Sequence, residues 1–238
     1  MRILSYNIRK AVGLDGRRNP ERVLSVIAHS GADVVILQEA DKRLGARPAA
    51  IPKRLIDLES DYDVVDVAAT DVSLGWHGNA VLVKAGVTVL ATERLHLPGL
   101  EPRGAVRVTV DTPATGRVDL IGAHLGLLRR WRRRQLAAIR SHVEPHHRQT
   151  TIIAGDFNEW SVSGGFEPLG RDFMVMSPGR SFHASYPVAP LDRFAHGSGL
   201  SLTDCGVIRT SEARRASDHL PVWAEFATAP ERADAKDG

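Results

Sequence analysis

Cysteine is scarce in this chain, because Cys205 is the only one among 238 residues. A single thiol excludes an internal disulfide framework and a cysteine-rich zinc site, and it is typical of a reducing compartment. Long hydrophobic runs are also absent, since no apolar span reaches the roughly 18 residues of a transmembrane helix and the N-terminus lacks the features of a signal peptide. We therefore expect a cytoplasmic, monomeric protein without a stable membrane anchor.

Charge of one sign is not in excess. The chain has 31 Lys and Arg residues against 28 Asp and Glu, a formal net charge of +3, which does not by itself indicate a polyanionic partner. The composition, 43% hydrophobic and 25% charged, is that of a globular protein, and no repeat or linker divides it. We predict one domain over residues 1–227 and a polar, disordered tail over residues 228–238.

Hydrophobic periodicity predicts an alternation of strands and helices. Helices are expected to begin after Asn19, an N-cap followed by Pro20, and over residues 48–60 and 128–143. Strands are expected over residues 3–8, 33–39, 62–67, 79–84, 87–97, 105–111, 117–125, 151–154, 190–194, 201–208 and 222–226. The four strands between residues 62 and 111 read as a meander with antiparallel pairing, and residues 160–170 as a rim or lid loop.

The motif Gly155-Asp156-Phe157-Asn158 closes the apolar strand 151–154. Side chains two apart on an extended segment share a face, so Asp156 and Asn158 can point at one volume while Phe157 turns into the core. Asp156 can hold or deprotonate an attacking water, and Asn158 can orient that water or bind a phosphoryl oxygen. The alternative is an ordinary turn, in which Asp and Asn are common.

Other predicted strands also end on polar side chains, namely Asn7, Glu39 and His124. Open α/β sheets present functional groups at the carboxyl ends of their strands. Taken singly, Glu39 is equally well a solvated carboxylate and His124 a core histidine with a backbone partner. Their repetition at strand ends favours a shared site.

Asp218 and His219 precede the last strand. Adjacent side chains point to opposite faces of a regular strand, so both can serve one site only if the backbone bends, which Ser217 and Pro221 permit. Asp192 can accept the imidazole N–H of His219, which would select its tautomer and raise its basicity. The segment thus predicts an acid–base dyad.

Oxygen ligands without cysteine are offered by Asn7, Glu39 and Asp218. Such a set suits a hard cation such as Mg²⁺ rather than zinc, and it points to phosphate chemistry.

Arginine occupies five of the six positions 129–134. Cations at a helix N-terminus oppose the macrodipole, so the cluster costs stability unless an anion or a nearby carboxylate offsets it. We therefore name Arg130 and Arg133 as candidate substrate ligands, although long Arg side chains can also lie over apolar surface with their heads in water. Arg103, in the loop 98–104, is a third candidate phosphate ligand or a solvated surface residue.

Taken in order, these motifs closely resemble the endonuclease/exonuclease/phosphatase superfamily over residues 3–226. The motifs are Ser5-Tyr6-Asn7, Gln38-Glu39, Gly122-Ala123-His124-Leu125, Gly155-Asp156-Phe157-Asn158, Leu191-Asp192 and Ser217-Asp218-His219. The resemblance implies a four-layer α/β sandwich, with two packed mixed β-sheets and helices on the outside. It also implies that Glu39 binds Mg²⁺ directly, or Mn²⁺ as a substitute, with Asn7 and Asp218 nearby.

The same resemblance implies roles for five further residues. Asp156 and Asn158 position the nucleophile. His219, oriented by Asp192, contacts the phosphate or transfers a proton, and His124 stabilises the developing charge or the leaving group. The general base stays open between Asp156 and His219.

Two positions depart from the superfamily pattern. Arg9 stands where nucleases of the abasic-site type carry a second acidic residue, which puts a second metal in doubt. Asn79 lies in the region where deoxyribonuclease-like members place a carboxylate behind the residue equivalent to His124, so either Asn79 substitutes or nothing does.

The resulting expectation is a Mg²⁺-dependent phosphoesterase that hydrolyses a phosphodiester. Nucleic acid is the favoured substrate because the arginines at 129–134 adjoin the His124 strand. The alternatives are a phospholipid or inositol-phosphate phosphoesterase of the sphingomyelinase-like kind, and a non-catalytic binding module on the same fold.

Overall fold

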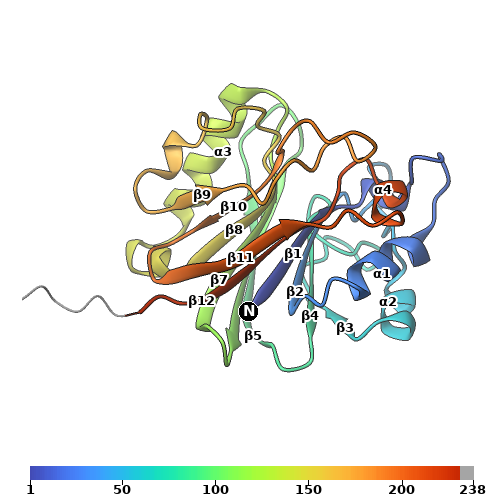
Figure 1. Ribbon diagram of the computed structural model, residues 1–238, viewed down its shortest axis with the longest axis horizontal. Helices are drawn as coiled ribbons and strands as arrows, with labels where there is room; N and C mark the ends of the chain where they lie inside the picture. The colour runs from blue at the N-terminus through green and yellow to red at the C-terminus, as the bar shows by residue number, and fades with distance from the viewer. Residues whose placement is uncertain (231–238) are drawn as a thin grey trace, which may run out of the picture.

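The computed structural model describes residues 1–230 and contains two six-stranded sheets packed face to face (Figure 1). The first sheet has the spatial order β11 (Leu200–Val207), β12 (Val222–Thr228), β1 (Arg2–Asn7), β2 (Val34–Gln38), β4 (Ala80–Lys84), β3 (Tyr62–Val64). The second has the order β5 (Thr88–His96), β6 (Gly104–Thr112), β7 (Gly116–His124), β8 (Thr151–Asp156), β10 (Asp192–His196), β9 (Met174–Met176).

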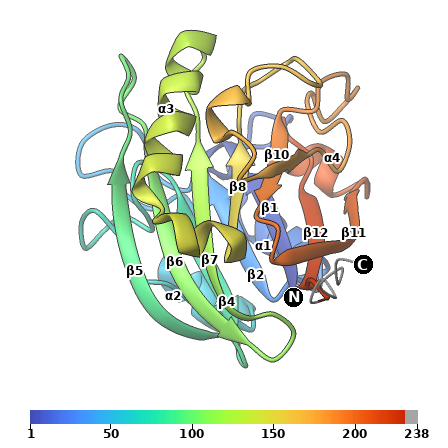
Figure 2. The same ribbon diagram turned by 90° about the vertical axis from the view of Figure 1, so that its left-hand side faces the viewer.

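Helices cover the outer faces of both sheets. The first sheet is covered by α1 (Pro20–Ala28), α2 (Lys53–Glu59) and α4 (Ala213–Ala216), and the second by α3 (Arg129–His142) (Figure 2). Short 3₁₀ turns are η1 (Arg9–Ala11), η2 (Pro145–Thr150) and η3 (Glu167–Leu169). This is the four-layer α/β sandwich that the resemblance implied, so the predicted fold class is confirmed.

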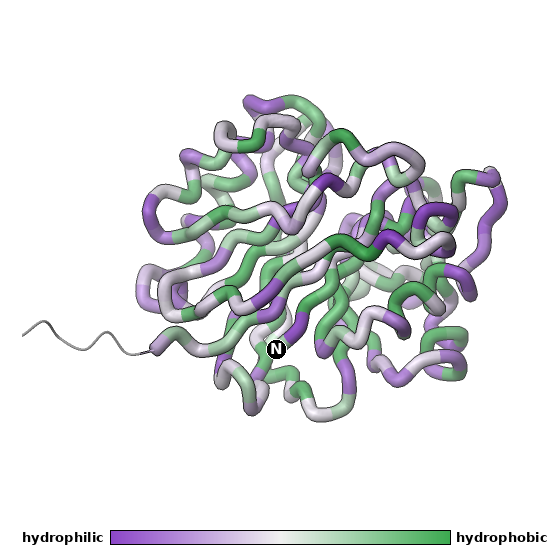
Figure 3. The backbone as a smooth tube through the Cα atoms, in the orientation of Figure 1, coloured by the Kyte–Doolittle hydropathy of each residue, from purple (hydrophilic) through white to green (hydrophobic). Residues whose placement is uncertain are grey.

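Three apolar layers hold the sandwich together. Because side chains alternate across a strand, each inner strand contributes to two layers. Ile3 packs between the sheets while Leu4 packs under the helices, and Leu120 and Ile121 divide in the same way in the second sheet. Hydrophobic residues predominate along the central strands and hydrophilic ones along the outer loops (Figure 3).

The first helix begins as expected and the second does not. Asn19 caps α1, its side-chain oxygen accepting the N–H of Arg22 at 2.8 Å. The helix predicted over 48–60 begins only at Lys53, because Pro52 disfavours helical geometry at the preceding residue. Leu58 fits the apolar pattern that predicted this helix, yet its side chain is 68% exposed.

The predicted meander is divided between the two sheets. Strands β3 and β4 pair antiparallel in the first sheet, whereas β5, β6 and β7 pair antiparallel in the second. The chain changes sheets at the turn around Gly86, whose φ of +96° suits a residue without a side chain. The three-residue edge strand β9 was not predicted, because it is too short to show a period.

The last described residues are held by the first sheet and its neighbouring turn. Thr228 belongs to β12, and the Ala229 N–H donates to the Gly199 carbonyl at 2.9 Å. The rest of the expected tail, residues 231–238, lies outside the described residues. Within residues 1–230, no helix combines the length and apolarity that crossing a membrane requires.

Candidate active site

Strand ends from both sheets meet at one edge of the sandwich. The parallel pair β1 and β2 sets Asn7 beside Gln38, and the parallel pair β7 and β8 sets His124 beside Asp156. Strand β10 runs antiparallel to β8, so its first residue, Asp192, faces Asp156. The sheet register therefore gathers chemically active side chains from four strands.

A cleft opens at this edge. Most of the residues named from the sequence line it, namely Asn7, Glu39, Arg103, His124, Asp156, Asn158, Asp218 and His219. Asp192 is fully buried and lies behind His219. The structure thus brings together all the expected catalytic and metal-binding residues and one of the three expected substrate arginines.

Asp156 lies at the centre of the buried part of the cleft. Asn7 donates its side-chain N–H to Asp156 Oδ2 at 3.0 Å, and the backbone N–H of Asn158 donates to Oδ1 at 2.9 Å. His124 Nε2 and His219 Nε2 lie 3.4 and 3.7 Å from Oδ2. Asp156 is 1% exposed, and these donors hold its carboxylate in a fixed orientation.

His219 forms the expected dyad with Asp192. Its Nδ1 lies 2.9 Å from Asp192 Oδ2, which also accepts the hydroxyl of Ser181. Burial opposes a charged imidazole, but the charges of Asp192 and Asp156 outweigh it and raise the pKa of His219 to about 10. With a carboxylate facing each ring nitrogen, both nitrogens serve as donors.

His124 has the opposite electrostatic character. Burial is the main cause that lowers the pKa of His124 to about 3; nearby Arg103 lowers it further, and Asp156 opposes both. The ring is therefore neutral near pH 7 and can donate one N–H. Asn79 does not orient it, because the Asn79 amide donates to the carbonyls of Trp76 and Gly104 at 3.2 and 2.9 Å.

Asn158 reaches the cleft by a different geometry from the extended one predicted. Its φ of +51° is left-handed, so it does not share a strand face with Asp156 by simple alternation. Its side-chain N–H donates to the carbonyl of Leu125 at 2.9 Å. Phe157 turns into the core as expected and is fully buried.

Glu39 and Asp218 supply the open, charged side of the cleft. Glu39 pairs with the ammonium of Lys10 and lies 3.8 Å from Arg43, and Asp218 Oδ2 lies 3.6 Å from the guanidinium of Arg9. Both carboxylates thus face positive charge. With Asn7 nearby, the donors are all oxygen, which fits Mg²⁺ or Mn²⁺ and not a thiophilic metal.

The three candidate substrate arginines separate in space. Arg103 lines the cleft and is held by Glu101, with nitrogen–oxygen distances of 3.0 and 2.8 Å. Arg133 instead pairs with Glu167, and Arg130 lies over the ring of Trp131. Neither Arg130 nor Arg133 lines the cleft, so their expected role concerns a surface outside it.

Nearby carboxylates offset much of the positive charge of the arginines at positions 129–134. Arg132 is buried and donates to Glu159 at 2.7 Å, and Arg129 lies 3.7 Å from the same carboxylate. These contacts supply the nearby anion that cations at a helix N-terminus require.

Sequence reasoning missed the aromatic rim of the cleft. Trp160 and Phe182 line it, and the Phe182 ring lies 4.9 Å from the imidazole of His219. Trp160 falls in the loop expected to form a rim, and its 61% exposure is unusual for a tryptophan. Phe182 left no signal in the sequence, because its loop is far from His219 along the chain.

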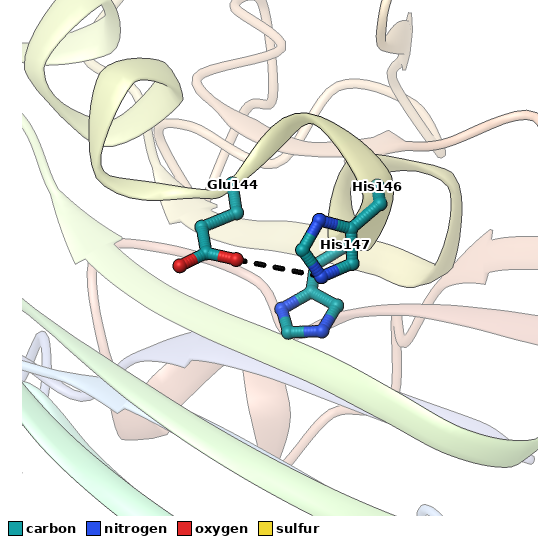
Figure 4. Close-up of side chains that lie close together, drawn as sticks. All are labelled: Glu144, His146 and His147. Carbon is teal, nitrogen blue, oxygen red and sulfur yellow. Dashed lines mark ion pairs between the residues drawn. The ribbon is translucent and has the colours of Figure 1, made fainter.

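A second cluster of possible metal ligands lies elsewhere. Glu144, His146 and His147 come together around η2, with Glu144 and His146 3.4 Å apart (Figure 4). The turn η2 leads into the first residue of β8, whereas the cleft lies at the last one. Glu144 and His146 are exposed, and the group takes no part in the cleft.

Comparison with known proteins identifies the family and the fold. Residues 4–219 match the model of the Endonuclease/Exonuclease/phosphatase family. The protein YbhP of Escherichia coli K12 is 28% identical over 94% of this chain and 95% of its own length. The Bacteroides thetaiotaomicron mannosyl-6-phosphatase Bt3783 superposes with a TM-score of 0.74, 16% identity, and 95% and 99% coverage of the two chains.

A further solved structure has the same fold. D. rerio TDP2, solved with a single-strand DNA product, superposes with a TM-score of 0.72 at 18% identity, covering 96% of this chain and 99% of TDP2. The family match spans nearly the whole described chain, and its members are enzymes that hydrolyse phosphoester bonds. The chain belongs to the Endonuclease/Exonuclease/phosphatase family.

Proposed function

We propose that this protein is a Mg²⁺-dependent phosphoesterase that hydrolyses a phosphodiester. The observation that carries the proposal is the Asp156 carboxylate, which is held by Asn7 and Asn158 with two imidazoles within 3.7 Å, at the floor of a cleft that also contains Glu39 and Asp218. A fixed anion beside proton donors is the arrangement that activates water next to a bound phosphate.

Each side chain has a role that its contacts support. Glu39 and Asp218, with Asn7 nearby, would hold Mg²⁺, which when bound neutralises charge on the phosphoryl oxygens. Asp156 accepts the proton of the attacking water, because both nitrogens of His219 serve as donors. His219 then donates a hydrogen bond to a phosphoryl oxygen, and Asp192 holds its ring in place.

Two polar groups complete the mechanism. The neutral His124 donates its N–H to the charge that develops in the transition state. Asn158 donates one amide N–H to the carbonyl of Leu125. Its amide oxygen can orient the water, and its second amide N–H can bind a phosphoryl oxygen.

Nucleic acid is the first substrate class that we propose. The likeness to TDP2, solved with a single-strand DNA product, supports it, and the exposed Trp160 at the rim offers a surface on which a base can stack. A small phosphorylated molecule or a phospholipid headgroup is the second class, favoured by a compact basic cavity beside Glu39.

The test is turnover of bis(p-nitrophenyl) phosphate with Mg²⁺ or Mn²⁺ and with EDTA, followed by a panel of single-stranded DNA, duplex DNA, RNA, phospholipid vesicles and inositol phosphates. We expect metal-dependent cleavage of the generic diester and of at least one member of the panel. Binding without turnover of any substrate would favour a non-catalytic module.

A further inference from the structure

A second cavity adjoins the cleft, and the proposed mechanism does not use it. It has a volume of about 160 Å³ and shares the walls formed by Glu39, Arg43, Glu101, Arg103 and His124 with the cleft. A water molecule occupies about 30 Å³, so the cavity holds a group considerably larger than a single water. A ligand can therefore extend from the cleft into the cavity.

The walls of this cavity are mainly cationic. Five basic residues line it, namely Lys10, Lys42, Arg43, Arg47 and Arg103. Three acidic residues also line it, and each is already engaged. Glu39 pairs with Lys10 and Glu101 with Arg103, while Asp41 accepts the backbone N–H groups of Leu74 and Gly75 at 2.6 and 3.2 Å.

Lys42 and Arg47 are the cations without a carboxylate partner. Neither side chain forms an ion pair with any residue between 1 and 230. Arg47 instead donates to His77 Nδ1 at 3.0 Å, and burial and the neighbouring Arg47 lower the pKa of His77. A neutral imidazole therefore orients Arg47 without cancelling its charge.

The backbone around the cavity is strained. Among the described residues, only seven residues other than glycine have positive φ, and four of them line this cavity: Lys10, Glu39, Arg47 and His77. Residues other than glycine rarely adopt such conformations, which persist at binding sites where the surrounding structure imposes them. Arg47 and His77, which form the hydrogen bond described above, have φ values of 54° and 50°.

We propose that this cavity binds a second phosphate group of the substrate. Of the two substrate classes proposed above, the cavity thus favours the second, a compact molecule with a phosphomonoester close to the phosphate that is cleaved. Lys42 and Arg47 supply the charge, and His77 positions Arg47. The inference rests on the proposed function for the identity of the cleaved phosphate. The phosphomonoester can belong to a free small molecule or to a lipid headgroup.

The first experiment compares matched substrates. Thymidine 5′-(p-nitrophenyl phosphate) is assayed with and without a 3′-phosphate, and phosphatidylinositol is assayed with and without a 4-phosphate in phosphatidylcholine vesicles. We expect the added phosphate to raise kcat/KM about tenfold or more, as a charge-assisted hydrogen bond does. A preference for the phosphorylated nucleotide in solution identifies a free molecule as the substrate. A preference seen only in vesicles identifies a lipid headgroup. If the added phosphate brings no preference in either assay, the inference is overturned.

The second experiment removes the unpaired charges. The double variant Lys42→Gln/Arg47→Gln should reduce the preference for the added phosphate about tenfold or more. The matched control is Lys53→Gln/Arg54→Gln, which removes two exposed cations from the nearby helix α2 and should leave the preference unchanged. An equal preference in both double variants would contradict the inference.

A binding measurement separates this inference from the proposed function. Pyrophosphate binding is measured by calorimetry in EDTA with the wild-type protein and both double variants. Weaker binding in Lys42→Gln/Arg47→Gln alone supports the cavity even if no substrate is turned over. Equal binding in all three proteins, with melting curves that show folded variants, overturns the cavity even if the diester is hydrolysed.

Discussion

The two sides of the cleft are built differently. On the side of β7, β8 and β10, Asp156, Asp192, His124 and His219 are at most 5% exposed and lie against one another, with nitrogen–oxygen distances of 2.9 to 3.7 Å. On the side of β1 and β2, Glu39 and its surroundings are open, and cations from loops face the carboxylates. The buried side is organised before a ligand arrives, whereas the open side holds charges that a metal and a substrate can satisfy.

This difference agrees with a division of tasks between the two sides. A buried hydrogen-bond network orients reacting groups before the reaction begins. Charged side chains at a cavity that are unpaired, or that can give up their present partner, instead bind ions of the opposite charge. We therefore propose that proton transfer belongs to the buried side, and metal and phosphate recognition to the open side.

The largest effect is expected from Glu39→Gln on the open side. The change removes one negative charge from the proposed metal site and keeps the shape of the side chain, so Mg²⁺-dependent turnover should fall to the level measured in EDTA while the melting temperature stays close to that of the wild type. Calorimetric titration with Mg²⁺ should show a matching loss of affinity. Glu21→Gln, on the exposed face of α1, is the control. Undiminished turnover at saturating Mg²⁺ would exclude Glu39 as a ligand.

On the buried side, Asp156→Asn should lower kcat by about a hundredfold or more, the usual contribution of a positioned acid–base group. The amide keeps the size of the carboxylate but cannot accept the proton. Single-turnover kinetics on a generic diester measure the effect, with the exposed Asp204→Asn as the control.

A similar loss, about a hundredfold, is expected for His219→Ala. The variant also leaves Asp192 buried without its main partner, so it should melt at a lower temperature than the wild type. His29→Ala on α1 is the control, since that histidine is exposed. Losses of tenfold or less in both Asp156→Asn and His219→Ala would contradict the catalytic assignment of the buried side.

Outside the cleft, Glu159→Gln should reduce stability by about 3 kcal/mol, because it leaves the buried guanidinium of Arg132 without its anion. Urea unfolding measures the change. Glu167→Gln is the matched control, since Glu167 pairs with Arg133 at the exposed surface and should change the stability much less than Glu159→Gln does. Equal effects would mean that the Arg132 pair is not buried in solution.

The smallest effect is expected from Arg130→Gln/Arg133→Gln. If these side chains bound a nucleic-acid backbone, the slope of log affinity against log salt would flatten by about one and a half to two units. Because Arg133 already pairs with Glu167 and neither residue lines the cleft, we expect a change of less than about one unit. Fluorescence anisotropy with single-stranded DNA at several salt concentrations distinguishes the two results. A flattening of the slope by about one and a half to two units would indicate that α3 binds the nucleic-acid backbone.

Much of the organisation of this molecule could be predicted from local pattern. Apolar runs that end on a polar residue locate the strands and the edge at which Asn7, Glu39, His124 and Asp156 gather, since parallel strands bring their carboxyl ends together. The order of these motifs also identified the family and the four-layer fold, both of which are confirmed. The expected hydrogen bond between His219 and Asp192 is present.

Other features could not be predicted, because they depend on which distant segments pack together. Alternation identifies a strand but not the sheet that it joins, so the change of sheet between β4 and β5 was missed. The arginine run gave a strong sequence signal, yet Glu159 and Glu167 neutralise much of it in the folded chain.

The basic cavity shows most clearly what the tertiary structure decides. Lys10, Lys42, Arg47 and His77 come from segments that are ordinary when read one by one. Only the packing of the first sheet beside the 98–104 loop places them around one cavity. The sequence determined most of the elements, because those follow from local periodicity and residue type, and the order of its motifs identified the family. The tertiary structure decided which charges remain unpaired, because a charge is neutralised or left available only by what the fold places within a few ångströms of it.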